Sequence, residues 1–215
     1  MARVEVRGTD GAGGGRAEQP LSEVCVREMA EADIDAVSAV RVRGWQAAYP
    51  GLMPQAYLDA MDVAQDAARR REWFARRRPE VWELVAGRAG RVVGWLAAGP
   101  ARDADLTRGA GSPTDGELAP EDREFPAGRR PAAELLALYV TPELLGTGVG
   151  RALLDAGTLR ARSLGYGALY LWVVRGNTRA QRFYERAGFA PDGAEAASDV
   201  GGRRVPELRY RRPLR

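Results

Sequence analysis

The stretch Glu134-Leu-Leu-Ala-Leu-Tyr-Val-Thr-Pro-Glu-Leu-Leu-Gly-Thr-Gly-Val-Gly150 decides the fold of this chain. Its first part, Leu135 to Val140, is apolar or aromatic throughout, which predicts a strand that is covered on both faces. Gly146, Gly148 and Gly150 follow, and the next residues place their apolar side chains on one helical face. The stretch therefore predicts a buried strand, a short turn and a glycine-rich entry into a helix.

Glycines at the entry of a helix favour the binding of an anion. Without Cβ atoms they let the backbone approach a ligand, and the positive end of the helix dipole attracts negative charge. A G-x-G-x-x-G fingerprint does not fit, because Arg151 or Leu153 takes the place of its last glycine, and a P-loop needs a lysine, which this chain lacks. From this loop alone, a pyrophosphate site and a purely structural helix cap both remain open.

A second segment makes the pattern specific. Ala168 to Val174 predicts another buried strand, and Gly176-Asn-Thr-Arg-Ala-Gln-Arg-Phe-Tyr-Glu-Arg-Ala-Gly-Phe189 follows it. The motifs L-x-x-L-Y-V-x-P, G-x-G-x-G and N-x-x-A-x-x-F-Y-x-x-x-G-F, in this order, resemble the GCN5-related N-acetyltransferase (GNAT) superfamily. The resemblance is specific from Glu134 to Phe189 and weaker over the rest of the chain from about Val24.

Composition and charge exclude several classes of protein. The 215 residues can form one domain with a substantial core, 45% of them are apolar, and no run approaches the ~18 apolar residues of a membrane span. The N-terminus has no apolar signal-peptide core, so the expected location is cytoplasmic. Basic and acidic residues number 32 and 29, an excess that suits an anionic cofactor and does not indicate nucleic-acid binding.

The absence of histidine constrains the chemistry. Ser-His and Cys-His nucleophilic systems are excluded, as are histidine-based zinc sites, and no metal is expected. Cys25 has no disulfide partner, and we expect it to be a small buried residue of a strand. Any general base must be a carboxylate, a phenolate or water.

Periodicity predicts one α/β domain over residues 23–215, after a disordered glycine-rich arm over residues 1–22. Its first half should begin with a strand from Val24 to Met29 and a helix from about Glu31. A second helical region should follow from about Pro54 to Arg78, with its arginines on a solvated face. Next we expect a hairpin of Val81–Ala86 with Arg91–Ala98, in which Gly94 indicates a bend or bulge.

Two later segments are less regular. Residues 100–131 lack periodicity, which predicts either a mobile, disordered loop or a lid over the acceptor. After Gly188 we expect an irregular connection and then a final strand at Arg204–Arg212, with Pro206 indicating an edge or a strand start.

The resemblance implies a single GNAT-type domain, α/β in class and α+β by some schemes. Its sheet should be mixed and mostly antiparallel, with helices on both faces and acetyl-CoA between two central parallel strands. The implied reaction is acetyl transfer from acetyl-CoA, as co-substrate, to a small-molecule or peptide amine by direct attack. The alternative is a non-catalytic acyl-CoA-binding or regulatory module on the same fold, and a monomer and a homodimer are both compatible with the sequence.

The resemblance also implies the cofactor contacts. Leu138, Tyr139 and Val140 would contact the pantetheine arm, and Asn177 would cap a helix or bond the same arm. Leu145 departs from the Arg or Gln that the family usually has there, but a main-chain cradle needs no particular side chain at that position. The implied pyrophosphate cradle consists of Gly146, Thr147, Gly148, Val149 and Gly150, with Arg151 adding positive charge.

Four residues are candidates for catalysis and acceptor binding. Tyr184 is either a core tyrosine, as its helical periodicity predicts, or the general acid that the resemblance implies. Glu134 is either an exposed residue at a strand start or the general base, with a water chain as the other possible base. Trp45 and Tyr49 are four residues apart on one helical face, so they are either an aromatic pair in the core or part of the acceptor groove.

Overall fold

The structure is a computed structural model that describes residues 24–103 and 131–214. The arm expected at residues 1–22 and most of the loop expected at residues 100–131 lie outside the described residues. The strands are β1 (Cys25–Glu28), β2 (Trp82–Arg88), β3 (Arg91–Pro100), β4 (Ala132–Val140), β5 (Ala168–Val174), β6 (Ala190–Val200) and β7 (Arg203–Pro213).

The helical elements lie between these strands. They are the 3₁₀ helices η1 (Glu31–Asp33) and η3 (Pro142–Leu144) and the α-helices α1 (Ile34–Ala48), α2 (Gln55–Asp59), α3 (Val63–Ala75), α5 (Val149–Ser163) and α6 (Thr178–Arg186). Within the described part of the chain, no helix is both long enough and apolar enough to cross a membrane.

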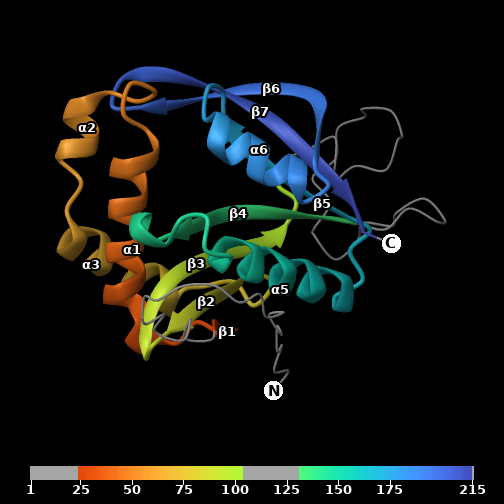
Figure 1. The fold of residues 1–215 in the computed structure, drawn as a ribbon, viewed down its shortest axis with the longest axis horizontal. Helices are drawn as coiled ribbons and strands as arrows, with labels where there is room; N and C mark the ends of the chain where they lie inside the picture. The colour runs from red at the N-terminus through yellow and green to blue at the C-terminus, as the bar shows by residue number, and fades with distance from the viewer. Residues whose placement is uncertain (1–23, 104–130, 215) are drawn as a thin grey trace, which may run out of the picture.

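All described strands join one sheet in the order β1-β2-β3-β4-β5-β7-β6. Neighbours are antiparallel everywhere except at the centre, where β4 and β5 are parallel (Figure 1). A parallel pair needs a crossover connection, and α5 supplies it. The expected mixed, mostly antiparallel sheet of a single α/β domain is confirmed.

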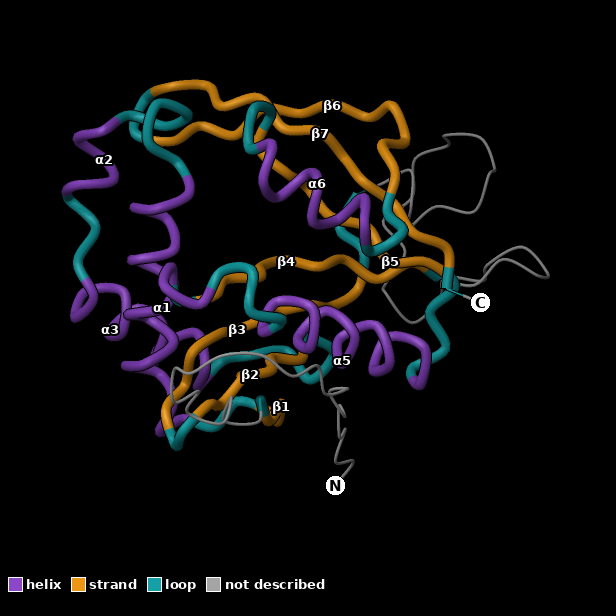
Figure 2. Tube along the Cα trace, viewed as in Figure 1, coloured by secondary structure: helices purple, strands orange, loops and turns teal. Residues whose placement is uncertain are grey.

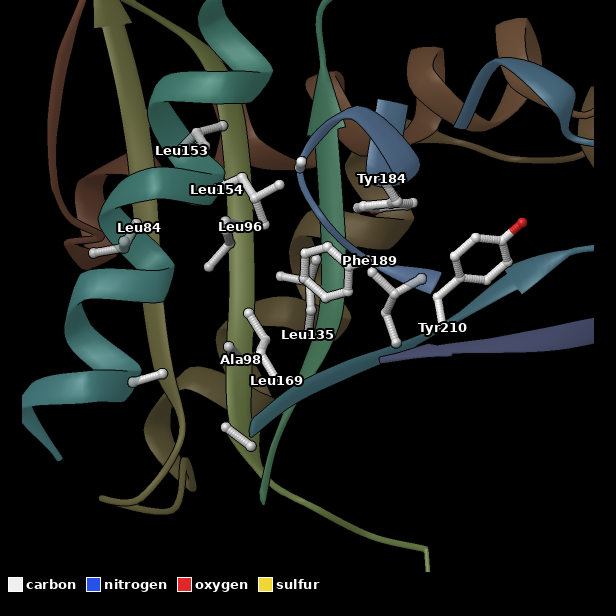
Figure 3. Close-up of a cluster of buried hydrophobic side chains, with 14 of the residues drawn as sticks. Leu84, Leu96, Ala98, Leu135, Leu153, Leu154, Leu169, Tyr184, Phe189 and Tyr210 are labelled. Atoms are coloured by element: carbon white, nitrogen blue, oxygen red, sulfur yellow. The ribbon is translucent and has the colours of Figure 1, made fainter. Parts of the chain in front are cut away.

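Helices cover both faces of the sheet. α5 and α6 place Leu153, Leu154 and Tyr184 in a core with Leu96 and other strand residues (Figure 3). On the opposite face, α1 and α3 bury a second cluster around Trp95. Each helix pair thus covers one face by its apolar side.

The helical region expected from about Pro54 to Arg78 consists of two helices, α2 and α3. Asp62 accepts a hydrogen bond from the Gln65 N–H at 2.8 Å and begins α3 as its N-cap. The expected solvated arginine face is wrong for Arg70, which is 4% exposed. Its guanidinium lies 4.2 Å from the Trp95 ring centroid and within 3.7 Å of two carboxylates.

Cys25 is exposed, so its expected burial is wrong. β1 is an edge strand that pairs only with β2. Successive side chains of a strand point to opposite faces. Because Val26 packs against the core, its neighbour Cys25 points away from it.

The chain after Gly188 also differs from expectation. The segment expected as an irregular connection is β6, whose mostly exposed side chains give no alternation of apolar residues. β6 pairs with β7, so β7 lies inside the sheet and the edge position predicted from Pro206 is wrong. Pro206 is tolerated because β5 already ends at Val174, opposite Glu207.

Two glycines let α5 lie close to β3. A Cβ at Gly94 would lie 2.9 Å from a Leu153 methyl carbon and 3.3 Å from the Tyr139 carbonyl oxygen. A Cβ at Gly157, on α5, would lie 2.9 Å from a Leu96 methyl carbon. The register of β2 on β3 shifts beside Gly94, which confirms the expected bulge.

We expect Gly94→Ala to lower the free energy of unfolding by about 1–3 kcal/mol, because the added methyl group overpacks the contact between α5 and β3. The measurement is urea unfolding, where the midpoint should fall with an unchanged slope. Gly87→Ala on the paired strand is the matched control, since its Cβ would meet nothing closer than 3.7 Å. Equal effects of the two substitutions would show that close packing at Gly94 is not what requires glycine.

Candidate functional site

The two parallel strands separate after a short paired segment. β4 and β5 pair only from Ala132 to Glu134 and from Ala168 to Tyr170. Beyond this segment β4 continues along β3 and β5 continues along β7, so the two strands diverge (Figure 2). Each then has an unpaired edge that faces the other, and such an edge can bind an extended ligand through backbone groups.

A bulge in β4 sets the direction of its side chains. The register on β3 shifts between Ala97 and Ala98, which leaves Leu136 without a direct partner. Tyr139, after the bulge, packs on the α1 face and stacks on Trp95 with ring centroids 6.2 Å apart. The bulge thus directs a phenol from the central strand toward the C-terminal end of α1.

The glycine-rich stretch forms the turn that enters α5. Gly146 and Gly148 have φ angles of 85° and 92°, which residues with a Cβ rarely adopt. No atom lies within 4 Å of the position that a Cβ would take at either glycine. Gly148 is the N-cap of α5 and no side chain caps this helix. The N–H groups of its first turn are therefore available to a ligand.

The other cradle residues have different roles. Thr147 donates from its hydroxyl to the Leu144 carbonyl oxygen at 2.8 Å and so holds the turn, while the Val149 side chain is fully buried. Neither of these side chains lines the pocket described below. Arg151 lines it and forms an exposed ion pair with Asp155 at 2.8 Å. Such exposed pairs are weak, so Arg151 can exchange Asp155 for a phosphate.

α6 begins at the residue that the sequence indicated. The Asn177 side-chain oxygen accepts a hydrogen bond from the Ala180 N–H at 3.2 Å, which confirms the helix cap. Asn177 also lines the pocket, so a contact with a ligand is compatible with its capping role.

α6 ends in a Schellman motif that fixes Tyr184. The Phe189 N–H donates to the Tyr184 carbonyl oxygen at 3.0 Å, the Gly188 N–H donates to the Glu185 carbonyl oxygen at 2.9 Å, and Gly188 has a φ of 85°. The rings of Tyr184 and Phe189 meet edge to face at 5.8 Å (Figure 3). The glycine and phenylalanine of the F-Y-x-x-x-G-F motif therefore position its tyrosine.

Tyr184 is buried and lines the pocket. Burial raises the pKa of its phenol well above the ordinary value, and the neighbouring Tyr139 adds to this shift. The phenol therefore stays protonated at neutral pH.

The aromatic pair of α1 divides between core and pocket. The rings of Trp45 and Tyr49 meet edge to face with centroids 5.2 Å apart. Trp45 packs with Tyr57 and under the Arg41 guanidinium, whereas Tyr49 lines the pocket. Both residues pack against a buried cluster, and a contact of Tyr49 with the acceptor stays a prediction.

One continuous pocket of about 850 Å³ connects these features. It runs from the glycine loop through the gap between β4 and β5 to α6 and to the end of α1. Leu138, Tyr139, Val140 and Gly150, all proposed from the sequence, lie along its wall. Its volume is within the ~300–1,000 Å³ that is usual for small-molecule and cofactor sites.

Glu134 does not reach this pocket. It is 2% exposed, and its carboxylate accepts hydrogen bonds from Arg102 at 2.8 and 2.5 Å and from the Tyr170 hydroxyl at 2.8 Å. Strong donors thus occupy both carboxylate oxygens at the paired base of β4 and β5. The structure does not bring Glu134 together with Tyr184, and the general-base role stays a prediction that this geometry does not favour.

Among the pocket-lining residues that sequence reasoning missed are Trp172, Arg179 and Arg186. Trp172 lies in a strand that is apolar throughout, so no alternation tells which face it occupies. Arg179 and Arg186 are seven residues apart, or two helical turns, so their position on one side of α6 was a signal available in the sequence.

These residues fit an acyl-CoA. The free N–H groups at the start of α5 suit a pyrophosphate, the unpaired edge of β4 suits an amide-bearing arm, and the exposed arginines suit phosphate groups. Within residues 24–103 and 131–214, no group of three or more acidic or thiol side chains is placed to hold a metal ion.

Known proteins resemble this chain in sequence. The family model described as the acetyltransferase (GNAT) family matches residues 45–189. An uncharacterized N-acetyltransferase of Mycobacterium tuberculosis is 31% identical over 164 residues, which cover 75% of this chain and 85% of the relative. A mycothiol acetyltransferase of Propionibacterium freudenreichii is 49% identical over 72 residues, but these are 34% of this chain and only 22% of that protein.

Solved structures resemble it in fold. The PaiA N-acetyltransferase of Thermoplasma acidophilum, in complex with coenzyme A, superimposes with a TM-score of 0.62 at 17% identity, covering 89% of this chain and 99% of that one. The family model that matches residues 45–189 and the 31% identity over most of the mycobacterial relative show that this chain belongs to the GNAT family.

Proposed function

We propose that this chain transfers the acetyl group of acetyl-CoA to a primary amine by direct attack. The observation that carries the proposal is that one pocket contains both the glycine entry of α5 and the protonated phenol of Tyr184. An anion-binding end and a proton donor in the same cavity are what this reaction needs.

The chain's own groups would divide the work. The first-turn N–H groups of α5, from Val149 to Arg151, would hold the pyrophosphate, and backbone groups of Leu138–Val140 would align the pantetheine arm. A backbone N–H of the same strand would polarise the thioester carbonyl. Tyr184 would then give its proton to the departing sulfur.

Glu134 has a structural role in this proposal. Its bonds to Arg102 and Tyr170 join the segment after β3 to the two central strands where they are still paired. A buried carboxylate whose two oxygens already accept hydrogen bonds stabilises the fold, and it is poorly placed to accept a substrate proton.

Acetyl-CoA at about 100 times its Kd should stabilise the protein by about 2.7 kcal/mol, if it binds the folded state alone. We expect Gly148→Ala to abolish most of this stabilisation, because a Cβ disfavours the positive φ that turns the loop N–H groups toward the pocket. Thermal unfolding with and without acetyl-CoA is the measurement.

Gly165→Ala is the matched control for this substitution. Gly165 has a similar φ of 84° with no atom within 4 Å of its Cβ position, but it lies after the other end of α5. It should lose a comparable amount of stability and keep the full response to acetyl-CoA. If both variants respond like wild type, the glycine loop is a structural turn and no cradle.

Tyr184→Phe should lower kcat by about a hundredfold or more, the usual contribution of a positioned acid, and keep acetyl-CoA affinity. The measurement is thiol release with a panel of primary amines that includes propylamine and a short peptide with a free N-terminus. Tyr210→Phe, which removes another buried phenol whose hydroxyl bonds Glu185 at 3.1 Å, should leave kcat unchanged. A fully active Tyr184→Phe enzyme would remove the general-acid role.

Glu134→Gln should lower the free energy of unfolding by about 1–3 kcal/mol, because it weakens a buried hydrogen-bonded carboxylate, and should leave kcat within about twofold of wild type. Urea unfolding and steady-state rates check the two parts. A collapse of kcat without loss of stability would instead restore Glu134 as the general base.

A further inference from the structure

A carboxylate lies beside the α1 end of the pocket, on the same face of the sheet as Tyr49. Glu207 of β7 is directly opposite Val174 of β5, so both side chains point to the same face. Val174 and Val205, which flank Glu207, pack in one cluster with Tyr49 and Trp45. Glu207 is half-buried and lies beside this cluster, whose Tyr49 lines the pocket; Glu207 itself is next to the pocket lining and not part of it.

Within residues 24–103 and 131–214, Glu207 forms no ion pair. Its hydrogen-bond donor is the neutral Ser198 hydroxyl, 2.5 Å from Oε2. Arg209, the next residue of β7 on this face, is held by Asp103 at 2.9 Å and by Asp192 at 2.8 Å. A half-buried carboxylate with a neutral partner favours an added cation.

The field of this carboxylate reaches the pocket. Burial is the main reason why the pKa values of Tyr49 and Tyr139 are raised, and the Glu207 carboxylate raises both further. At Tyr139 the Arg41 guanidinium acts in the opposite sense and outweighs Glu207, whereas at Tyr49 Glu207 adds to the upward shift of the pKa. Because Tyr49 lines the pocket, a cation bound beside it would experience the negative charge of Glu207. The phenols themselves stay protonated and cannot serve as bases at neutral pH.

From this arrangement we infer that Glu207 binds the ammonium group of the acceptor and accepts its proton, so the acceptor is a cationic primary amine. The inference rests on the proposed acetyl transfer. Glu134, the other buried carboxylate near the central strands, already accepts from Arg102 and Tyr170 through both oxygens. Glu207 has Ser198 on one oxygen, so within the described residues its other oxygen is left for the ammonium.

The protons and electrons balance in this scheme. The ammonium gives one proton to Glu207, and the freed lone pair forms the C–N bond. The C–S bond then breaks, its electron pair leaves with sulfur, and sulfur takes the proton of Tyr184. The Tyr184 phenolate recovers a proton from the nitrogen, which becomes the amide, and Glu207 releases its proton to water.

The test compares two small nucleophiles that differ in charge. Propylamine is a cation at neutral pH, whereas methoxyamine is neutral and needs no base before it attacks. In Glu207→Gln, whose amide oxygen can still accept from Ser198, kcat/KM for propylamine should fall about a hundredfold while that for methoxyamine stays within about twofold. Glu195→Gln is the matched control, because that carboxylate on the adjacent strand pairs with Arg175 and should affect neither nucleophile.

Each other outcome overturns the inference. An equal loss for both nucleophiles would give Glu207 a structural role, and no loss for either would leave it without a role in acceptor binding. A wild-type enzyme that uses methoxyamine and rejects propylamine would exclude a cation site. If acetyl-CoA does not bind, or binds and no amine is acetylated, the proposed function itself fails, which the thermal-shift and thiol-release assays show separately.

Discussion

The short pairing between β4 and β5 is the constraint on which the rest of the structure depends. Only three residues of each strand are paired with the other strand. At this paired segment, the buried carboxylate of Glu134 accepts hydrogen bonds from Tyr170 and Arg102, which fixes the two strands together. Beyond this point each strand is held by its antiparallel neighbour and diverges from the other. A buried charge with strong donors thus fixes the base of the gap, and the gap supplies the backbone edges that a ligand needs.

The two sides of the gap carry different chemistry because different helices are attached to them. Close packing at Gly94 and Gly157 holds α5 against β3, which brings its anion-binding N-terminus to the β4 side. The Schellman motif of α6 places Tyr184 on the other side. The proposed ligand cradle and the proposed proton donor therefore come from separate halves of one sheet, and the pocket that both line lies where the central strands diverge.

Much of this was predictable from local patterns. The apolar run of Ala168–Val174 gave β5 its observed bounds, and the glycine entry and the Asn177 cap followed from backbone requirements that few residues satisfy. β6 could not be found in this way, because pairing with β7 makes it a strand while its own side chains are mostly exposed. Cys25 was misplaced because the strand was recognised but its buried face was not.

The carboxylates show where sequence spacing stops being informative. Glu134 lies in β4, beside the gap, whereas Glu207 lies in β7, which β5 separates from the gap. What each carboxylate can reach depends on the bulge at Leu136, on the position of β7 between β5 and β6, and on the neighbouring side chains. Arg102 and Tyr170 occupy Glu134, whereas Glu207 has a hydroxyl as its donor. The same functional group therefore stabilises the fold at Glu134, whereas at Glu207 we propose that it binds a cation, and the difference lies in the neighbours of each carboxylate.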